Sequence, residues 1–244
     1  MKTSGVQGDL SPNLQPKNNH DIAHRGSHPG GIQENSLEAF IEAGERGFCG
    51  AEADVLFDEN GNLVVEHNFS DINSQTITID EYLDVCKEYG MTAIIDLKYV
   101  TKDEKSERYK SLGPTVVAKI EEKGMIDSCV IQTNHDDDIP NIRQSSKDVR
   151  IWMLGYDYVG DDQINIALEN DVECINFNSK STTITDSNIK KITAAGLDSC
   201  VWGIDDTAYK NRLINQGATY IMSDEPLGIT PYQEGDKDYN GIVN

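Results

Sequence analysis

The stretch DIAHRGSHPGGIQENSLEAF, residues 21–40, contains one complete strand-to-helix unit. A short apolar run ends at His24 and Arg25, a glycine-rich bend follows, and a helical pattern begins after Asn35, which we expect to cap the helix. A turn of this kind requires the glycines and the cap, but it does not require the histidine, the arginine or Glu34. These three side chains therefore indicate a functional site at the end of the first strand.

The same alternation of apolar runs and helical patterns continues along the chain. The apolar runs span residues 21–24, 51–57, 92–98, 129–133, 150–156, 174–178, 199–204 and 219–223. They are apolar on both faces, as expected for parallel strands covered by helices. Eight such units in 244 residues predict an α/β fold, a single-domain (β/α)8 TIM barrel near the small end of its usual size. A doubly wound open sheet is the alternative.

A further short run at residues 62–68 follows the turn DENGN and predicts a small β-hairpin after the second strand. We expect residues 21–230 to form the barrel. Residues 1–20 are polar and contain two prolines, so they are expected to form a flexible arm or linker. Residues 231–244 form a C-terminal tail without a strong helical pattern, so the eighth helix is expected to be missing or supplied by a neighbouring chain. An oligomer is therefore possible.

The charge balance limits the classes of partner. Acidic residues outnumber basic ones by 42 to 21, and the net charge of −21 argues against nucleic acids and anionic membrane surfaces. An anionic substrate stays compatible, because a bound divalent cation can invert the local field. No apolar stretch is long enough for a transmembrane segment, and the N-terminus lacks the apolar core of a signal peptide. We expect a cytoplasmic protein, or a virion or secreted one if the sequence is truncated at its N-terminus.

The five cysteines are scattered, odd in number and without CxxC spacing. Free thiols in a reducing environment are therefore expected rather than a disulfide framework.

Polar residues gather where the predicted strands end. In a barrel of this class, chemistry takes place at the C-terminal ends of the strands. The side chains expected there include His24, Arg25, Glu52, Asp54, His67, Asp96, Lys98, Gln132, Asn176, Asn178, Trp202 and Asp224. Two histidines near one barrel mouth suggest a general acid and a general base.

The acidic residues have a spacing that places them on one side. Glu52 and Asp54 are two residues apart in one strand, as are Asp96 and Lys98 in the next, so each pair faces the same way. Inward-facing carboxylates are costly unless they are paired or bound to a cation. For a single carboxylate, a buried salt bridge with Lys98 or Arg25 is an equal alternative. The three together favour an oxygen site for one divalent metal ion, Mg²⁺ or Ca²⁺.

The ordered set of motifs is more specific than any one of them. The segments HRG…QENSLEAF, EADV, GNLVVEHN, DLK, VWGID and GATYIMSDEP occur along residues 21–228. This order resembles the glycerophosphodiester phosphodiesterase family, a phosphatidylinositol-phosphodiesterase-like TIM barrel. That family typically shows His-Arg-Gly, Pro-Glu-Asn-Thr, Glu-Leu-Asp, a second histidine, Glu-x-Lys, a tryptophan in the seventh strand and Thr-Asp-x-Pro.

The resemblance implies metal-dependent hydrolysis of a phosphodiester, first of all a glycerophosphodiester, to an alcohol and glycerol phosphate. By this similarity the metal ligands are Glu52, Asp54 and Asp96, and the acid–base pair is His24 and His67. The phosphate would be held by Arg25 and Lys98. Glu34 would line the site, and Trp202 would form an apolar wall for the alcohol. The partner is then a small-molecule or polymeric phosphodiester. Such an enzyme belongs to lipid metabolism.

Two departures from the family pattern keep other functions open. Asp96 stands where the family usually has a glutamate, and only ten residues separate His67 from Thr78, where family members usually carry an insertion. The more open mouth allows a teichoic-acid (polyglycerol-phosphate) depolymerase or a lysophospholipase D-like enzyme. A non-catalytic phosphodiester-binding module of a phage tail or surface protein is a third alternative.

Overall fold

The computed structural model describes residues 20–99, 106–155, 157–204, 206–225 and 227. Eight parallel strands close into a barrel in the order β1-β9-β8-β7-β6-β5-β4-β2, and β1 pairs with β2 to complete the ring. The strands are β1 (Asp21–Ala23), β2 (Gly50–Phe57), β4 (Thr92–Leu97), β5 (Cys129–Thr133), β6 (Arg150–Leu154), β7 (Cys174–Asn178), β8 (Asp198–Trp202) and β9 (Tyr220–Ser223). The predicted (β/α)8 barrel is confirmed, and the open-sheet alternative is excluded.

The predicted hairpin is also present. Strand β3 (Leu63–Val65) pairs antiparallel with β2 outside the barrel ring, and Val65 lies opposite Val55. The turn is closed by Asp58, whose carboxylate accepts hydrogen bonds from the backbone of Asn60 and Asn62. The hairpin matters for the site because it leads the chain from the C-terminal end of β2 back to the level of Asp54.

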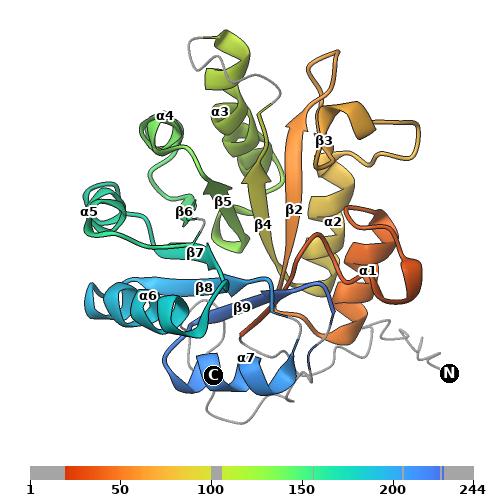
Figure 1. Cartoon of the computed structure of the whole chain (residues 1–244). Helices are drawn as coiled ribbons and strands as arrows, with labels where there is room; N and C mark the ends of the chain where they lie inside the picture. Colours follow the sequence, from red (N-terminus) through yellow and green to blue (C-terminus); the bar gives the residue numbers. More distant parts are fainter. Residues whose placement is uncertain (1–19, 100–105, 156, 205, 226, 228–244) are drawn as a thin grey trace, which may run out of the picture.

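The helices lie around the outside of the strands (Figure 1). They are α1 (Leu37–Arg46), α2 (Ile79–Tyr89), α3 (Glu107–Glu122), α4 (Ile139–Ser145), α5 (Asp161–Glu169), α6 (Thr182–Ala194) and α7 (Thr207–Asn215). Within the described part of the chain, no helix is long and apolar enough to cross a membrane. Apart from residue 20, the expected arm at 1–20 and the expected tail at 231–244, including the eighth helix, lie outside the described residues.

The core has two shells, as the alternation of side chains along a strand requires. The inner shell fills the barrel and is built from Ile22, Cys49, Ile94, Val130, Trp152, Cys174, Cys200, Tyr220 and Met222. The larger outer shell lies between strands and helices. All five cysteines are free and buried, which confirms the expectation of free thiols. The inner shell supports the mouth from below.

The cap of α1 corrects one prediction. The helix is capped by Ser36, whose hydroxyl accepts a hydrogen bond from the backbone N–H of Ala39 at 3.2 Å, and not by Asn35. Asn35 instead adopts a left-handed backbone with φ of 57° and directs its amide to Asp54. Asn35 and Ser36 can both cap a helix. Because the amide of Asn35 is hydrogen-bonded to Asp54 on β2, Ser36 is the residue that caps α1.

Candidate active site

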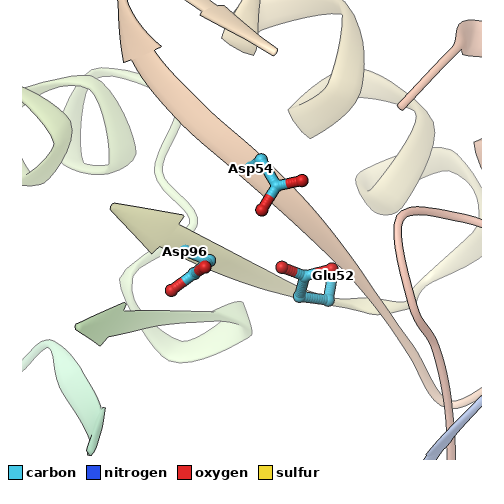
Figure 2. Close-up of side chains that lie close together, drawn as sticks. All are labelled: Glu52, Asp54 and Asp96. Carbon is cyan, nitrogen blue, oxygen red and sulfur yellow. The ribbon is translucent and has the colours of Figure 1, made fainter. Parts of the chain in front are cut away.

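Three carboxylates meet inside the mouth of the barrel. Glu52 and Asp54 lie on β2, and Asp96 lies on β4 directly opposite Asp54 in the strand register. One oxygen from each lies within 4.8 Å of the others, and all three residues are buried. Figure 2 shows the three side chains pointing toward one another from the two neighbouring strands. The predicted convergence of the acidic residues is therefore present.

Asp54 is the most heavily contacted member of this acidic cluster. Its oxygens lie 3.1 Å from Arg25 Nε, 3.0 Å from Lys98 Nζ and 3.1 Å from His67 Nδ1. The amide of Asn35 donates a hydrogen bond to it at 2.8 Å. Burial opposes ionisation, but His67, Lys98 and Arg25 outweigh it and hold the pKa of Asp54 well below its ordinary value. The salt bridges that were an alternative to a metal are thus present on this residue.

Asp96 shares the lysine. Lys98, two residues further along the chain, contacts both Asp96 and Asp54 and so bridges β4 and β2. Burial disfavours the charged ammonium, but the fields of Asp96, Asp54 and Glu52 raise the pKa of Lys98 above its ordinary value. The lysine therefore stays a cation at the edge of the cluster, where it can face an anionic group.

Glu52 lacks such a partner. Among the described residues, no cationic side chain lies within ion-pair distance of it, and its carboxylate accepts a hydrogen bond from the backbone N–H of Arg25 at 2.9 Å. Burial and the nearby charge of Asp54 raise the pKa of Glu52 to about 8. A cation at the cluster would supply the missing charge. Three carboxylates are hard oxygen donors, so the residues fit Mg²⁺ and Ca²⁺ alike.

The His-Arg-Gly turn explains how the backbone of Arg25 reaches Glu52. Arg25 has φ of 57° and Gly26 has φ of 81°, so two successive residues are left-handed. A Cβ on Gly26 would lie 2.7 Å from that of Ala39, which excludes any larger residue there. The arginine side chain is held on its outer side by Glu34, which accepts a hydrogen bond from Nη1 at 2.8 Å.

His24 is oriented by a carboxylate from the other end of the chain. Its Nδ1 lies 2.7 Å from Asp224 Oδ1, in the turn after β9. Its ring stacks on Trp202 of β8, with the ring centres 6.2 Å apart and an angle of 22° between the planes. Burial disfavours the imidazolium, but Asp224 and Glu52 together raise the pKa of His24 above its ordinary value. With Nδ1 engaged, Nε2 is the nitrogen left for chemistry.

His67 follows β3 and contacts the acidic cluster directly. Its Nδ1 lies 3.1 Å from Asp54 Oδ2, and its side chain is 35% exposed. The hairpin holds it there, because the backbone N–H of Glu66 donates a hydrogen bond to the carbonyl of Asp54 at 3.0 Å. His67 therefore contacts the acidic cluster, His24 lies beside Arg25 at the same mouth, and each histidine has one ring nitrogen held by a carboxylate.

The structure places three of the nine sequence-predicted site residues within strands β2 and β4, one at the end of β8 and five in the segments that follow strands: Glu52, Asp54 and Asp96; Trp202; and His24, Arg25, Glu34, His67 and Lys98. Sequence reasoning gave no site role to Asn35, Gln132 or Asp224, although Gln132 and Asp224 stand at predicted strand ends. Asn35 was missed because its type and position also suit a helix cap. Asp224 was missed because its partner His24 is 200 residues away along the chain.

The fold and the site together define a (β/α)8 barrel with a buried cluster of three carboxylates and two carboxylate-bound histidines at its mouth. No protein-family model and no curated protein matches the sequence. Solved structures do match. A glycerophosphodiester phosphodiesterase from Parabacteroides distasonis is 21% identical, with a TM-score of 0.73 over 85% of this chain and 94% of its own.

Two further structures extend the comparison. An Oleispira antarctica phosphodiesterase, in complex with the product sn-glycerol-3-phosphate, is 19% identical, with a TM-score of 0.70 over 88% of this chain and 95% of its own. A glycerophosphodiester phosphodiesterase from Thermotoga maritima is 16% identical, with a TM-score of 0.60 over 84% of this chain and 94% of its own. At these identities the likeness establishes that the chain has the fold of these enzymes.

Proposed function

We propose that the protein is a metal-dependent phosphodiester hydrolase that cleaves glycerophosphodiesters to an alcohol and glycerol phosphate. The observation that carries this proposal is the buried cluster of Glu52, Asp54 and Asp96 at the same barrel mouth as two carboxylate-bound histidines. A histidine pair can supply the acid and the base for hydrolysis of an anionic diester, and three acidic ligands can hold the metal that assists it. The fold shared with glycerophosphodiester phosphodiesterases supports the same reaction class.

The three carboxylates would hold one divalent ion, which supplies positive charge to the phosphate oxygens. Arg25 and Lys98 add fixed positive charge at the same place, and they are already positioned by Glu34, Asp54 and the backbone. Positioned charges stabilise the transition state more than mobile ones do, because they need no reorganisation. Trp202 stacks on His24 and would form the apolar wall for the leaving alcohol.

The proton transfers are assigned to the two histidines. His24 is held toward its protonated form by Asp224, so we assign it the proton that the departing alkoxide receives. His67 would take the proton from the nucleophile, either water or a neighbouring hydroxyl of the glycerol. In the second case the first product is a cyclic phosphate, which water then opens to glycerol phosphate.

The test is hydrolysis of glycerophosphocholine with Mg²⁺ or Ca²⁺, followed by phosphorus NMR. We expect glycerol phosphate to appear, EDTA to stop the reaction and added metal to restore it. His24→Ala and His67→Ala should each lower kcat by roughly 10²–10⁴-fold. His135→Gln serves as the control, because this histidine packs on Tyr99 and Tyr109. Normal turnover in either alanine variant would refute the assigned roles.

The ten-residue segment between His67 and Thr78 bears on substrate size. It carries Phe69, whose side chain is exposed, beside the catalytic candidate His67. A short segment leaves the mouth open on this side, so a polyglycerol-phosphate or lysophospholipid is a second substrate class to include. Hydrolysis of teichoic acid in preference to glycerophosphocholine would favour the depolymerase. Binding of teichoic acid without hydrolysis of any diester would favour a non-catalytic module.

A further inference from the structure

Two buried amides lie next to the acidic cluster, and the mechanism above does not use them. Gln132 on β5 and Asn176 on β7 face the barrel interior and are 2% and 0% exposed. The Asn176 Nδ2 donates a hydrogen bond to Gln132 Oε1 at 2.8 Å. Leu154 and Met222, on β6 and β9, contribute apolar side chains to the same wall.

The hydrogen bonds give this pair a direction. Asn176 Nδ2 faces two acceptors, since Met222 Sδ lies 3.9 Å away on its other side. With its oxygen taken by Asn176, Gln132 is left with its Nε2 group as donor. Gln132 is the register partner of Asp96 across β4 and β5, so the two side chains lie next to each other on the inner face of the barrel. A chain of donors therefore runs from Asn176 through Gln132 to Asp96.

Asp96 has two fixed partners on its carboxylate. One is Lys98, which contacts it as an ion pair, and the other is its register neighbour Gln132, whose free amide nitrogen is the donor available on that side. Asp96 is also one methylene shorter than the glutamate expected at this position from the family resemblance, so it has less freedom to reach an ion by rotation. We propose that Gln132 and Asn176 are positioning residues that orient Asp96 toward the divalent cation. This inference rests on the proposed function, since it assumes that the acidic cluster binds a metal.

A purely structural role accounts poorly for the pair. Asn176 Oδ1 is buried and has no hydrogen-bond partner among the described residues. A buried acceptor left unpaired costs roughly 1–3 kcal/mol. Two apolar side chains of similar volume, like the neighbours Leu154 and Met222, would fill the same space without that penalty. The amides are therefore explained by what they do to Asp96.

The experiment is calorimetric titration of the metal-stripped full-length protein with Mg²⁺, Ca²⁺ and Mn²⁺. Gln132→Met keeps the volume and removes the donor to Asp96. We expect metal affinity to fall about 10–100-fold, as is usual when a partner of a ligand is removed. The kcat for glycerophosphocholine should return to within about threefold of the parent value at saturating metal. A metal affinity within twofold of the parent would overturn the inference.

A second variant tests the direction of the chain and keeps the inference falsifiable if Gln132→Met unfolds. In Asn176→Asp the new carboxylate cannot donate, so Gln132 must turn its Nε2 toward position 176 and present its oxygen to Asp96. Metal affinity should fall although a negative charge is added. Asn178→Asp is the matched control, because it adds the same charge two residues further along the same strand. Its metal affinity should equal or exceed that of the parent.

Two failures are distinguishable. If the parent binds metal and hydrolyses diesters, and Gln132→Met and Asn176→Asp both bind metal as tightly as the parent, the inference alone is wrong. If the folded parent binds none of the three metals, the proposed function fails, and the inference fails with it. Thermal melts of every variant identify those that retain the fold.

Discussion

Asp54 shows how a single residue can hold a site together. It is contacted by an arginine, a lysine, a histidine and an asparagine, which come from the loops after β1, β3 and β4. Its neighbour Glu52, two residues away on the same strand, has no cationic side chain at ion-pair distance among the described residues. The difference explains why burial raises the pKa of Glu52 whereas the partners of Asp54 lower its pKa. One strand thus carries, on the same face, an acid paired with cationic side chains and an acid without a cationic partner among the described residues.

The His24–Asp224 pair gives a prediction about pH. A general acid works in its protonated form, so activity falls as pH rises through its pKa. Asp224 raises the pKa of His24, and Asp224→Asn should therefore move the alkaline limb of kcat/KM to lower pH. The measurement is kcat/KM for glycerophosphocholine between about pH 5 and 10.

The control is Asp206→Asn, which changes a carboxylate that caps α7 and does not contact His24. Its pH profile should match that of the parent. An Asp224→Asn profile that is lower at every pH but unshifted would contradict the assignment of His24 as the acid.

At the scale of an element, the start of α1 separates a structural from a functional residue. Ser36→Ala removes the cap and should lower the free energy of unfolding by about 1 kcal/mol with kcat unchanged. Asn35→Gly tolerates the left-handed backbone and removes only the amide that holds Asp54. We expect it to weaken metal binding. Chemical denaturation and metal titration of both variants measure these effects. A loss of stability in Asn35→Gly together with a loss of metal binding in Ser36→Ala would indicate that Asn35 is the cap.

The packing of α7 on β1 depends on one buried ion pair. Lys210 Nζ lies 2.6 Å from Asp21 Oδ2 and also donates a hydrogen bond to the carbonyl of Leu227 at 2.9 Å. Lys210→Met leaves Asp21 buried and unpaired, which should cost about 3–5 kcal/mol in the free energy of unfolding.

The double variant Asp21→Asn with Lys210→Met removes both charges and should recover part of that loss, because no uncompensated charge stays buried. Urea denaturation of the parent, the single and the double variants measures the difference. A single variant within about 1 kcal/mol of the parent would show that this pair does not anchor the helix.

At the scale of the whole molecule, the sequence predicted the barrel well because strand and helix periodicities alternate clearly and strand ends share one face. It also predicted which side chains gather at the mouth. It could not predict which carboxylate is paired, since Arg25, Lys98 and His67 could each have contacted any of the three acids. Nor could it predict the His24–Asp224 contact, which exists only because the barrel closes between β9 and β1.

The net charge of −21 predicts how substrate classes respond to salt. A polyanion such as teichoic acid is repelled by the acidic surface, and salt screens that repulsion over a Debye length of about 8–10 Å. The kcat/KM for teichoic acid should therefore rise with NaCl concentration when the metal concentration is held constant. Zwitterionic glycerophosphocholine should respond little. Assays of both substrates between low and high salt check this; a teichoic-acid rate that falls steadily with salt would contradict the repulsion.

The central claim is that Glu52, Asp54 and Asp96 hold one divalent cation at the barrel mouth. Anomalous diffraction from crystals grown with Mn²⁺ tests it most directly. We expect one strong anomalous peak bounded by these three carboxylates and lost in crystals of Glu52→Gln. A map with no peak there, in which Arg25 and Lys98 remain the cationic partners of the carboxylates, would contradict the metal site.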